Sequence, residues 1–153
     1  LSVSEKPHAP AAIRGHDLPH GATAVRIGVI RDAAFQFYYP ENLRALEEQG
    51  AEVVEINSLT SARLPDDLAG LYIGGGFPET QMQALAANTA MRQQIREAIG
   101  NGLPAYAECG GLMYLCRSLR WQDKQYEMAG VIPAAPPQGY RFGHCLFQPR
   151  GFG

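Results

Sequence analysis

The sequence predicts an α/β fold, an open and mostly parallel sheet with helices on both faces. Short apolar runs typical of buried strands alternate four times with segments of helical periodicity, and the connections between them are short. Two glycine-containing sequences of unusual composition follow apolar runs, at the strand ends where an open α/β sheet binds its ligands. The 153 residues suffice for one domain with a sizeable core.

The first strand is predicted at residues 25–30, and a helix follows at 40–50. Pro40 lies in the first turn of that helix, and Gly50 marks its C-terminal end. Further strands are predicted at 51–56, 68–73 and 103–107, and further helical segments at 79–87, 89–99 and 110–119.

Both ends of the sequence depart from this alternation. After residue 120 we predict a polar hairpin or turn at 121–128, a short strand at 131–134 and irregular structure from Pro136 onward. Prolines, glycines and histidines interrupt any period in residues 1–24, which we interpret as a linker or tail. The domain itself is then predicted to span residues 25–153.

Composition excludes several classes of protein. The net charge is −2 and no Lys/Arg cluster appears, which disfavours nucleic acid and anionic membranes as partners. No apolar stretch approaches the roughly 20 residues that a membrane-spanning helix needs, and the N-terminus lacks the apolar core of a signal peptide. The three cysteines have no short paired spacing, which indicates a cytoplasmic protein without a disulfide framework or a metal site.

The most informative motif surrounds Cys109. An apolar run ends at this thiol, two glycines follow, and a helical pattern then begins. Small residues two positions before and after it, Ala107 and Gly111, are what a strained strand-to-helix turn requires, because larger side chains would collide. A helix N-terminus stabilises a thiolate through its dipole and its unpaired N–H groups. We therefore predict that Cys109 is a nucleophile for acyl chemistry, with the Gly110 amide at the oxyanion.

A second glycine-rich motif follows the predicted strand at 68–73. Gly74, Gly75 and Gly76 are not followed by the lysine and the serine or threonine of a P-loop, so nucleotide binding is disfavoured. Consecutive strands are usually neighbours, so this loop and Cys109 should border one crevice. We predict that amides of the three glycines contribute to oxyanion and substrate binding beside the thiol.

Other residues near this crevice have two interpretations. The aromatic cluster at 35–40 favours packing under a loop, with a crevice wall or a docking surface for a partner domain as the alternative. Glu79 and Glu108 are interpreted as surface carboxylates, or else as contacts to a substrate amine. Cys116 is interpreted as core or interface filler. His144 is a candidate general base, although its irregular surroundings disfavour that role.

Three ordered stretches resemble a known family: residues 31–43 (RDAAFQFYYPENL), 71–79 (LYIGGGFPE) and 107–115 (AECGGLMYL). They are similar to the glutaminase domain of cobyrinic (hydrogenobyrinic) acid a,c-diamide synthase, a class I glutamine amidotransferase module with a flavodoxin-like sheet. The resemblance covers residues 26 to about 134, and three motifs in matching order make it specific.

The resemblance implies that Cys109 attacks the side-chain amide of glutamine, that ammonia leaves, and that water hydrolyses the glutamyl thioester. It implies no cofactor in this domain. The partner would be an N-terminal synthetase domain that uses ATP and magnesium to activate carboxylates of a corrinoid, with residues 1–24 as the interdomain linker.

The sequence also departs from this family. The family's catalytic histidine lies in a Gly-His-Glu-Phe-type stretch that is not found here. We therefore expect a domain that is incomplete at its C-terminal end, with little glutaminase activity by itself, because a thiol without its base is a weak nucleophile. An uncovered apolar edge would favour homo-oligomers.

Three alternatives stay open at this point. The ammonia could serve a cobyric acid or nickel-sirohydrochlorin amidating relative, because the glutaminase half does not itself meet the tetrapyrrole. A DJ-1-like hydrolase or stress protein also places a cysteine on such a turn. A catalytically silent module that only docks on a synthetase partner is the non-enzymatic alternative.

Overall fold

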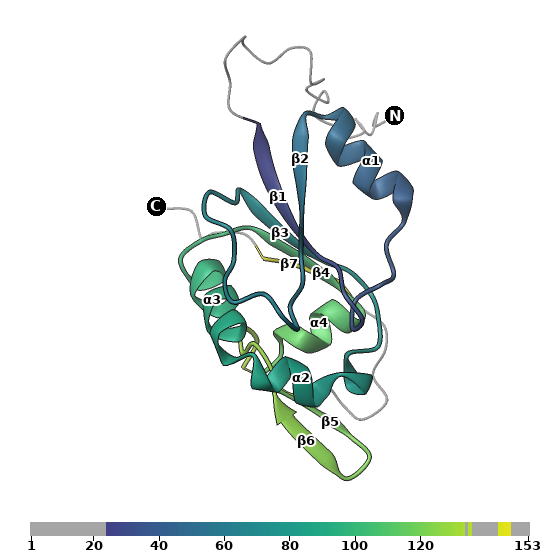
Figure 1. The fold of residues 1–153 in the computed structure, drawn as a ribbon, viewed down its shortest axis with the longest axis vertical. Helices are drawn as coiled ribbons and strands as arrows, with labels where there is room; N and C mark the ends of the chain where they lie inside the picture. Colours follow the sequence, from purple (N-terminus) through teal and green to yellow (C-terminus); the bar gives the residue numbers. More distant parts are fainter. Residues whose placement is uncertain (1–23, 134, 136–143, 148–153) are drawn as a thin grey trace, which may run out of the picture.

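The computed structural model describes residues 24–133 and 135, together with the backbone of residues 144–147 (Figure 1). Its centre is a five-stranded sheet in the order β2-β1-β3-β4-β7. The strands are β1 (Val25–Ile30), β2 (Ala51–Ile56), β3 (Gly70–Ile73), β4 (Ala105–Glu108) and β7 (His144–Phe147). The first four are parallel, and β7 is antiparallel to β4. The predicted mostly parallel sheet is therefore confirmed; residues 1–23 of the predicted linker lie outside the described residues.

The two faces of the sheet carry different residues, because successive side chains on a strand point to opposite sides. On one face of the sheet, register partners from four neighbouring strands are all buried: Ile56, Ile30, Ile73 and Ala107. These residues belong to the hydrophobic core, which continues into the helices that cover this face. Burying such aliphatic side chains contributes about 1.5–3 kcal/mol each.

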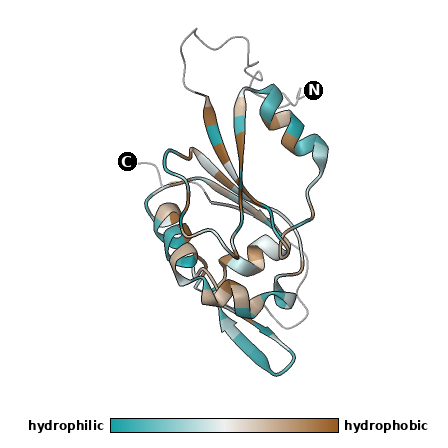
Figure 2. Cartoon of the chain, viewed as in Figure 1, coloured by the Kyte–Doolittle hydropathy of each residue, from teal (hydrophilic) through white to brown (hydrophobic). Residues whose placement is uncertain are grey.

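Helices cover both faces, as predicted. They are α1 (Pro40–Glu48), α2 (Met82–Ala87), α3 (Thr89–Gly100) and α4 (Gly110–Leu115). Leu85 of α2, Ile95 of α3 and Leu115 of α4 are fully buried in the core. On the opposite face, Leu46 of α1 lines a groove together with Tyr106 of the sheet. Helix α1 has no fully buried residue, and it is largely hydrophilic in Figure 2.

The connections place a crevice at the carboxyl ends of the central strands. The chain leaves β1 toward β2 on one side, and returns across β1 to build β3 and β4 on the other side. Loops that follow β1 and β3 therefore diverge at the point where the strand order reverses, which is the usual ligand site of an open α/β sheet. Helix α4, which follows β4 directly, lies at this same end of the sheet (Figure 1).

The predicted helix at 110–119 is wrong in its second half. Helix α4 ends at Leu115, and residues 118–121 form β5 (Ser118–Trp121), which pairs with β6 (Lys124–Glu127). The cause is tertiary: the carbonyls of Tyr114, Leu115 and Cys116 accept hydrogen bonds from Ala129, Ile132 and Gly130 rather than from a further helical turn. The predicted polar hairpin at 121–128 is confirmed, but it begins earlier, at Ser118.

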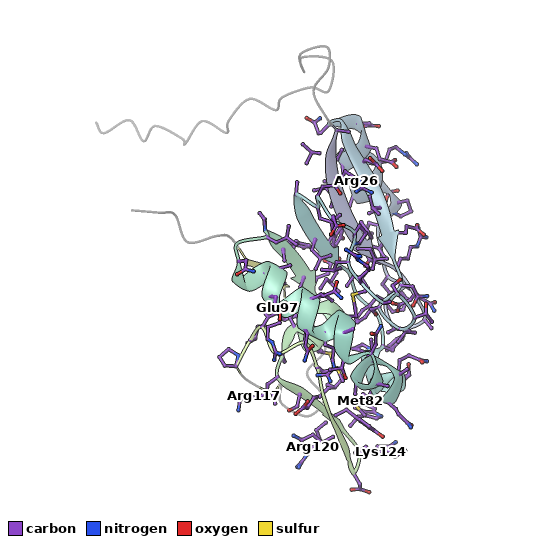
Figure 3. All side chains as sticks on the ribbon, turned by 60° about the vertical axis from the view of Figure 1, so that its left-hand side comes forward. Arg26, Met82, Glu97, Arg117, Arg120 and Lys124 are labelled. Atoms are coloured by element: carbon purple, nitrogen blue, oxygen red, sulfur yellow. The ribbon has the colours of Figure 1, made fainter. Side chains whose placement is uncertain are left out.

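That returning segment also corrects the prediction of a strand at 131–134. Within the described part of this range, Ile132 makes only an isolated bridge to Cys116. The hairpin β5–β6 itself projects from the body and is hydrophilic (Figure 2). Figure 3 shows the side chains of Arg120 and Lys124 on it, at the opposite end of the molecule from Arg26.

The prediction of irregular structure from Pro136 onward is also wrong in part. Residues 136–143 lie outside the described part of the chain, but 144–147 form β7 against β4. A four-residue strand of sequence HCLF carries little periodicity, and its existence depends on the free edge of β4, which the sequence does not reveal.

The core also contains one feature that predicts a stabilising substitution. Tyr114 is fully buried and packs against Phe35 with ring centroids 5.4 Å apart, and its hydroxyl has no hydrogen-bond partner among the described residues. A buried unsatisfied hydroxyl costs about 1–3 kcal/mol. We expect Tyr114→Phe to raise the free energy of unfolding in urea by about 1 kcal/mol.

The matched control is Tyr39→Phe, at a tyrosine that is 68% exposed, and it should leave stability unchanged. A loss of stability in Tyr114→Phe would contradict the expectation and indicate that the hydroxyl is satisfied in solution.

Candidate active site

Cys109 forms the whole turn between β4 and α4. The strand ends at Glu108 and the helix begins at Gly110, so the thiol sits on a one-residue corner. Its backbone has φ 49° and ψ −114°, a conformation that L-residues rarely adopt. Such strain costs about 1–3 kcal/mol and persists only where the surroundings impose it. The predicted strand-to-helix turn is therefore present, with the Cys109 side chain half-buried.

The two glycines after the thiol permit a close backbone approach. A β-carbon built at Gly111 would lie 2.2 Å from the carbonyl oxygen of Ile73. A β-carbon at Gly110 would lie 2.8 Å from Cδ of Pro78 and 2.9 Å from the carbonyl oxygen of Gly76. Any side chain at either position would separate α4 from the end of β3. Gly111, which the sequence indicated must be small, is thus required by packing against a second segment, and so is Gly110.

That second segment is the triple-glycine loop at 74–76. A β-carbon built at Gly75 would lie 3.7 Å from Cβ of Cys109, so the loop and the thiol border one site, as expected. At Gly76 a β-carbon would lie 1.9 Å from the carbonyl oxygen of Ala34, which accepts a 2.9 Å hydrogen bond from Phe77. The strand-to-helix turn at Cys109, with its neighbours 107–111, is called the elbow below. The loop is therefore enclosed by the elbow on one side and by the segment after β1 on the other.

Asp32 holds the turn on which this loop rests. Its Oδ1 accepts a hydrogen bond from the Ala34 amide at 2.8 Å, and its Oδ2 accepts two, both at 2.7 Å, from the amide and the hydroxyl of Ser58. Ser58 is fully buried. Asp32 was not among the site residues predicted from the sequence, although an aspartate that follows a strand at this distance is typical of an Asx turn.

The hydrogen-bond partners of the backbone amides near Cys109 indicate which amides are available to an oxyanion. The Gly74 amide donates to Oη of Tyr38 at 2.8 Å, and the Gly75 amide donates to the carbonyl of Phe37 at 3.2 Å. These two amides are engaged within the protein, whereas the prediction assigned all three glycines of the loop to oxyanion and substrate binding. For Gly76 and Gly110, no hydrogen bond from the amide is found within the described part of the chain. These are the amides that can serve an oxyanion beside Cys109.

Three tyrosines occupy the face of the sheet that α1 partly covers. Tyr38 packs edge-to-face on Tyr72, and Tyr72 on Tyr106, with ring centroids 5.1 and 5.2 Å apart. The hydroxyls of Tyr72 and Tyr106 donate to the two carboxylate oxygens of Glu108 at 2.9 and 3.2 Å. Glu108, directly before the thiol, is thus held by the sheet rather than lying as an isolated surface carboxylate.

The remaining sequence interpretations have mixed outcomes. Glu79 is 8% exposed, so its interpretation as a surface carboxylate is wrong. Cys116 is buried, its thiol lies 3.4 Å from the carbonyl of Leu112, and burial raises its pKa, so it is core filler as expected. In the aromatic cluster, Phe35 is buried, whereas Phe37 is 55% exposed at the crevice.

His144 does not lie in irregular structure, which is a correction. It belongs to β7, where its register partner is Glu108, the residue before the thiol. The backbone of the candidate base is thereby placed beside the elbow. Among the described residues, no three His, Cys, Asp or Glu side chains are grouped so as to hold a metal ion. The same residues include no helix with the length and apolar character that crossing a bilayer requires.

The hollows lined by the described residues include two that lie away from the thiol. The larger, about 680 Å³, is lined by residues that precede β3 and β4, including Leu64, Glu97 and Pro104. The other, about 410 Å³, lies between α1 and the tyrosine face. Size alone would favour the first as a binding site, but no residue of the elbow or the glycine loop lines it. We therefore place the candidate site at Cys109 and not in the larger hollow.

Comparison with known proteins shows the family of this chain. Residues 26–137 match the CobB/CobQ-like glutamine amidotransferase domain. The chain belongs to this family. The matched range includes the elbow, the glycine loop and the tyrosine face.

Two similar curated proteins are cobyrinate a,c-diamide synthases. The chain is 44% identical over 141 residues to the cobyrinate a,c-diamide synthase of Magnetococcus marinus, covering 89% of this chain and 30% of the relative. It is 49% identical over 118 residues to the synthase of Archaeoglobus fulgidus, covering 77% of this chain and 25% of the relative. The chain thus spans less than a third of the length of these relatives.

The glycine loop of this amidotransferase domain generates a matched pair of predictions. Gly76→Ala should lower the free energy of unfolding by about 1–3 kcal/mol, because its β-carbon would collide with the carbonyl of Ala34. Gly100→Ala, at the end of α3 where a β-carbon meets nothing within 4 Å, should leave stability unchanged or raise it by up to about 1 kcal/mol. Denaturant titration of both variants measures the difference. Equal effects would show that the loop is free to move aside.

The tyrosine face predicts a loss of stability at alkaline pH. Burial raises the pKa of Tyr72 to about 12, and the neighbouring Glu108 acts in the same direction. The unfolded chain releases this proton near pH 10, so stability should fall as the pH rises from about 10 to about 12. Unfolding measured across this range should show a shallower loss in Tyr72→Phe. An identical slope in both proteins would refute the assignment.

Proposed function

We propose that this chain is the glutaminase domain of a cobyrinate a,c-diamide synthase, and that in the full-length synthase ammonia is released from glutamine at Cys109. The single observation that carries the proposal is the thiol on its strained corner, with the amides of Gly76 and Gly110 beside it. Membership of the amidotransferase family and the names of the relatives support the same chemistry. The tetrapyrrole substrate is taken from those names.

The proposed reaction has two steps. The sulfur of Cys109 attacks the side-chain amide carbon of glutamine, a C–S bond forms, and the C–N bond breaks as ammonia leaves with the proton it gains. Water then attacks the thioester carbon, releasing glutamate and restoring the thiol. In both steps the carbonyl oxygen becomes an oxyanion, and donors such as the Gly76 and Gly110 amides stabilise it by about 3–4 kcal/mol each.

The backbone around the thiol suits this role because it is fixed in advance. Donors that need no reorganisation during the reaction stabilise developing charge most effectively. Here the loop and α4 are joined by a 3.0 Å hydrogen bond from the Gly111 amide to the carbonyl of Gly74. The amides on either side of the thiol therefore move as one unit with the corner.

Ammonia produced here would be used by the part of the synthase that lies outside this chain. We assign ATP and magnesium to that part, since the glycine loop continues into Phe77 and Pro78 where a P-loop has its lysine and its serine or threonine. That part would activate the a and c carboxylates of a corrinoid for attack by ammonia. A cobyric acid or nickel-sirohydrochlorin relative would use the same glutaminase chemistry.

The test is covalent labelling with 6-diazo-5-oxo-norleucine, a glutamine analogue. The diazo carbon takes up the thiol proton, the sulfur displaces dinitrogen, and mass spectrometry locates the resulting C–S bond on a peptide. We expect one adduct at Cys109, slowed by competing glutamine and abolished in Cys109→Ala. Cys116→Ala is the matched control, because that thiol is buried in the core, and it should retain the adduct.

Two outcomes of this labelling experiment would overturn the proposal. An unmodified Cys109 in the folded wild-type protein would overturn the proposal and favour a silent docking module. Modification by peroxide or aldehydes without reaction of the analogue would also overturn it, and would favour a DJ-1-like thiol chemistry.

A further inference from the structure

Tyr38 connects the end of β1 to the glycine loop through both functions of its hydroxyl. The hydroxyl donates a hydrogen bond to the carbonyl of Ile30, the last residue of β1. It accepts a 2.8 Å hydrogen bond from the amide of Gly74, the first residue of the loop. A phenol that both donates and accepts is fixed in rotation, so it fixes the direction of the Gly74 N–H as well.

The chain of hydrogen bonds continues to the elbow. The carbonyl of Gly74 accepts a 3.0 Å hydrogen bond from Gly111, two residues after the thiol. Gly74 is thus held by Tyr38 on its amide side and by α4 on its carbonyl side. An uninterrupted path of hydrogen bonds joins Ile30, through Tyr38 and Gly74, to the helix that begins beside Cys109.

The ring of Tyr38 is confined as well as its hydroxyl. A β-carbon built at Gly74 would lie 2.6 Å from Cε1 of Tyr38, so the ring occupies the space that any side chain at 74 would need. Its other side packs edge-to-face on Tyr72, which is bonded to Glu108. Burial raises the pKa of Tyr38, so the hydroxyl keeps the proton that it donates to Ile30.

We propose that Tyr38 is a positioning residue for the reaction at Cys109. Its hydroxyl takes the Gly74 amide away from the reacting carbonyl and sets the loop so that the amides of Gly76 and Gly110 face the oxyanion. Tyr38 touches no reacting atom in this arrangement and acts through the loop alone. The inference rests on the proposed function, because an oxyanion forms only if Cys109 attacks a carbonyl.

If Tyr38 only stabilised the fold, its loss would slow every reaction of Cys109 alike. Two reactions of this thiol therefore distinguish a positioning role of Tyr38 from a purely structural one. Acylation by the γ-(4-nitrophenyl) ester of glutamate forms a C–S bond at a carbonyl carbon as nitrophenolate leaves, and it passes through an oxyanion. Alkylation by iodoacetamide forms a C–S bond as iodide leaves, and it needs no oxyanion donor. A misplaced loop slows only the first reaction, whereas a damaged elbow slows both.

The experiment compares Tyr38→Phe with wild type in both reactions, with peptide mass spectrometry confirming Cys109 as the site. Because removal of one oxyanion donor costs about 10²–10³-fold in rate, a donor that is displaced rather than removed should cost about 10-fold or more. We expect acylation to slow by that factor at unchanged half-saturation by the ester, and alkylation to change by less than about two-fold. Tyr39→Phe removes the exposed neighbouring hydroxyl and should leave both rates unchanged.

Equal slowing of the two reactions, or no slowing of acylation, would overturn the positioning role. A wild-type protein whose Cys109 is alkylated but never acylated would instead overturn the proposed function. In that case, amide hydrogen exchange still tests whether Tyr38 holds the glycine loop in place.

In wild type, the Gly74 amide should be protected and the Gly76 amide should exchange quickly. Tyr38→Phe should accelerate exchange at Gly74 and Gly111 while the α3 core residue Ile95 is unaffected. An unprotected Gly74 in wild type would reject the inference even if the variant failed to fold.

Discussion

The candidate site depends on the direct contact of two backbones, the triple-glycine loop and the corner at Cys109. Their approach leaves no room for a β-carbon at Gly110 or Gly111, and this contact is what brings a thiol and donor amides together. It exists because β3 and β4 are neighbours in the sheet, so that the segments leaving them meet at one edge. The hydrophobic core beneath holds both strands in register and therefore fixes the distance between the two segments.

The corner also shows how strain is maintained. The positive φ of Cys109 costs about 1–3 kcal/mol, and the helix that follows has only six residues, too few to be stable in isolation. What maintains the conformation is the set of tertiary bonds on either side, from Gly111 to Gly74 and from the 129–132 segment to the end of α4. Local sequence permits the corner, and distant segments impose it.

The sequence was informative wherever the cause of a structure is local. Apolar runs located the four parallel strands, and the pairing of Cys109 with small neighbours located the elbow, because both patterns depend on residues close in the chain. It was uninformative where the cause is tertiary. Helix α4 ends at Leu115 because its last carbonyls accept hydrogen bonds from amides about fifteen residues later in the chain, and β7 forms because β4 has an open edge. The hydroxyl that holds Gly74 belongs to one of three adjacent aromatic residues, and no local feature distinguishes that residue from the other two.

The pairing between Phe37 and Gly75 is made in both directions by main-chain atoms alone, at 3.1 and 3.2 Å. Side-chain identity at 37 therefore contributes little to this bridge, whereas the number of residues between Ile30 and Phe37 determines whether it can form. An insertion or deletion there would shift the partner of Gly75 by a whole peptide unit. The segment after β1 is thus constrained in length more than in composition, and a family built on this crevice can diversify its rim by substitution while keeping its spacing.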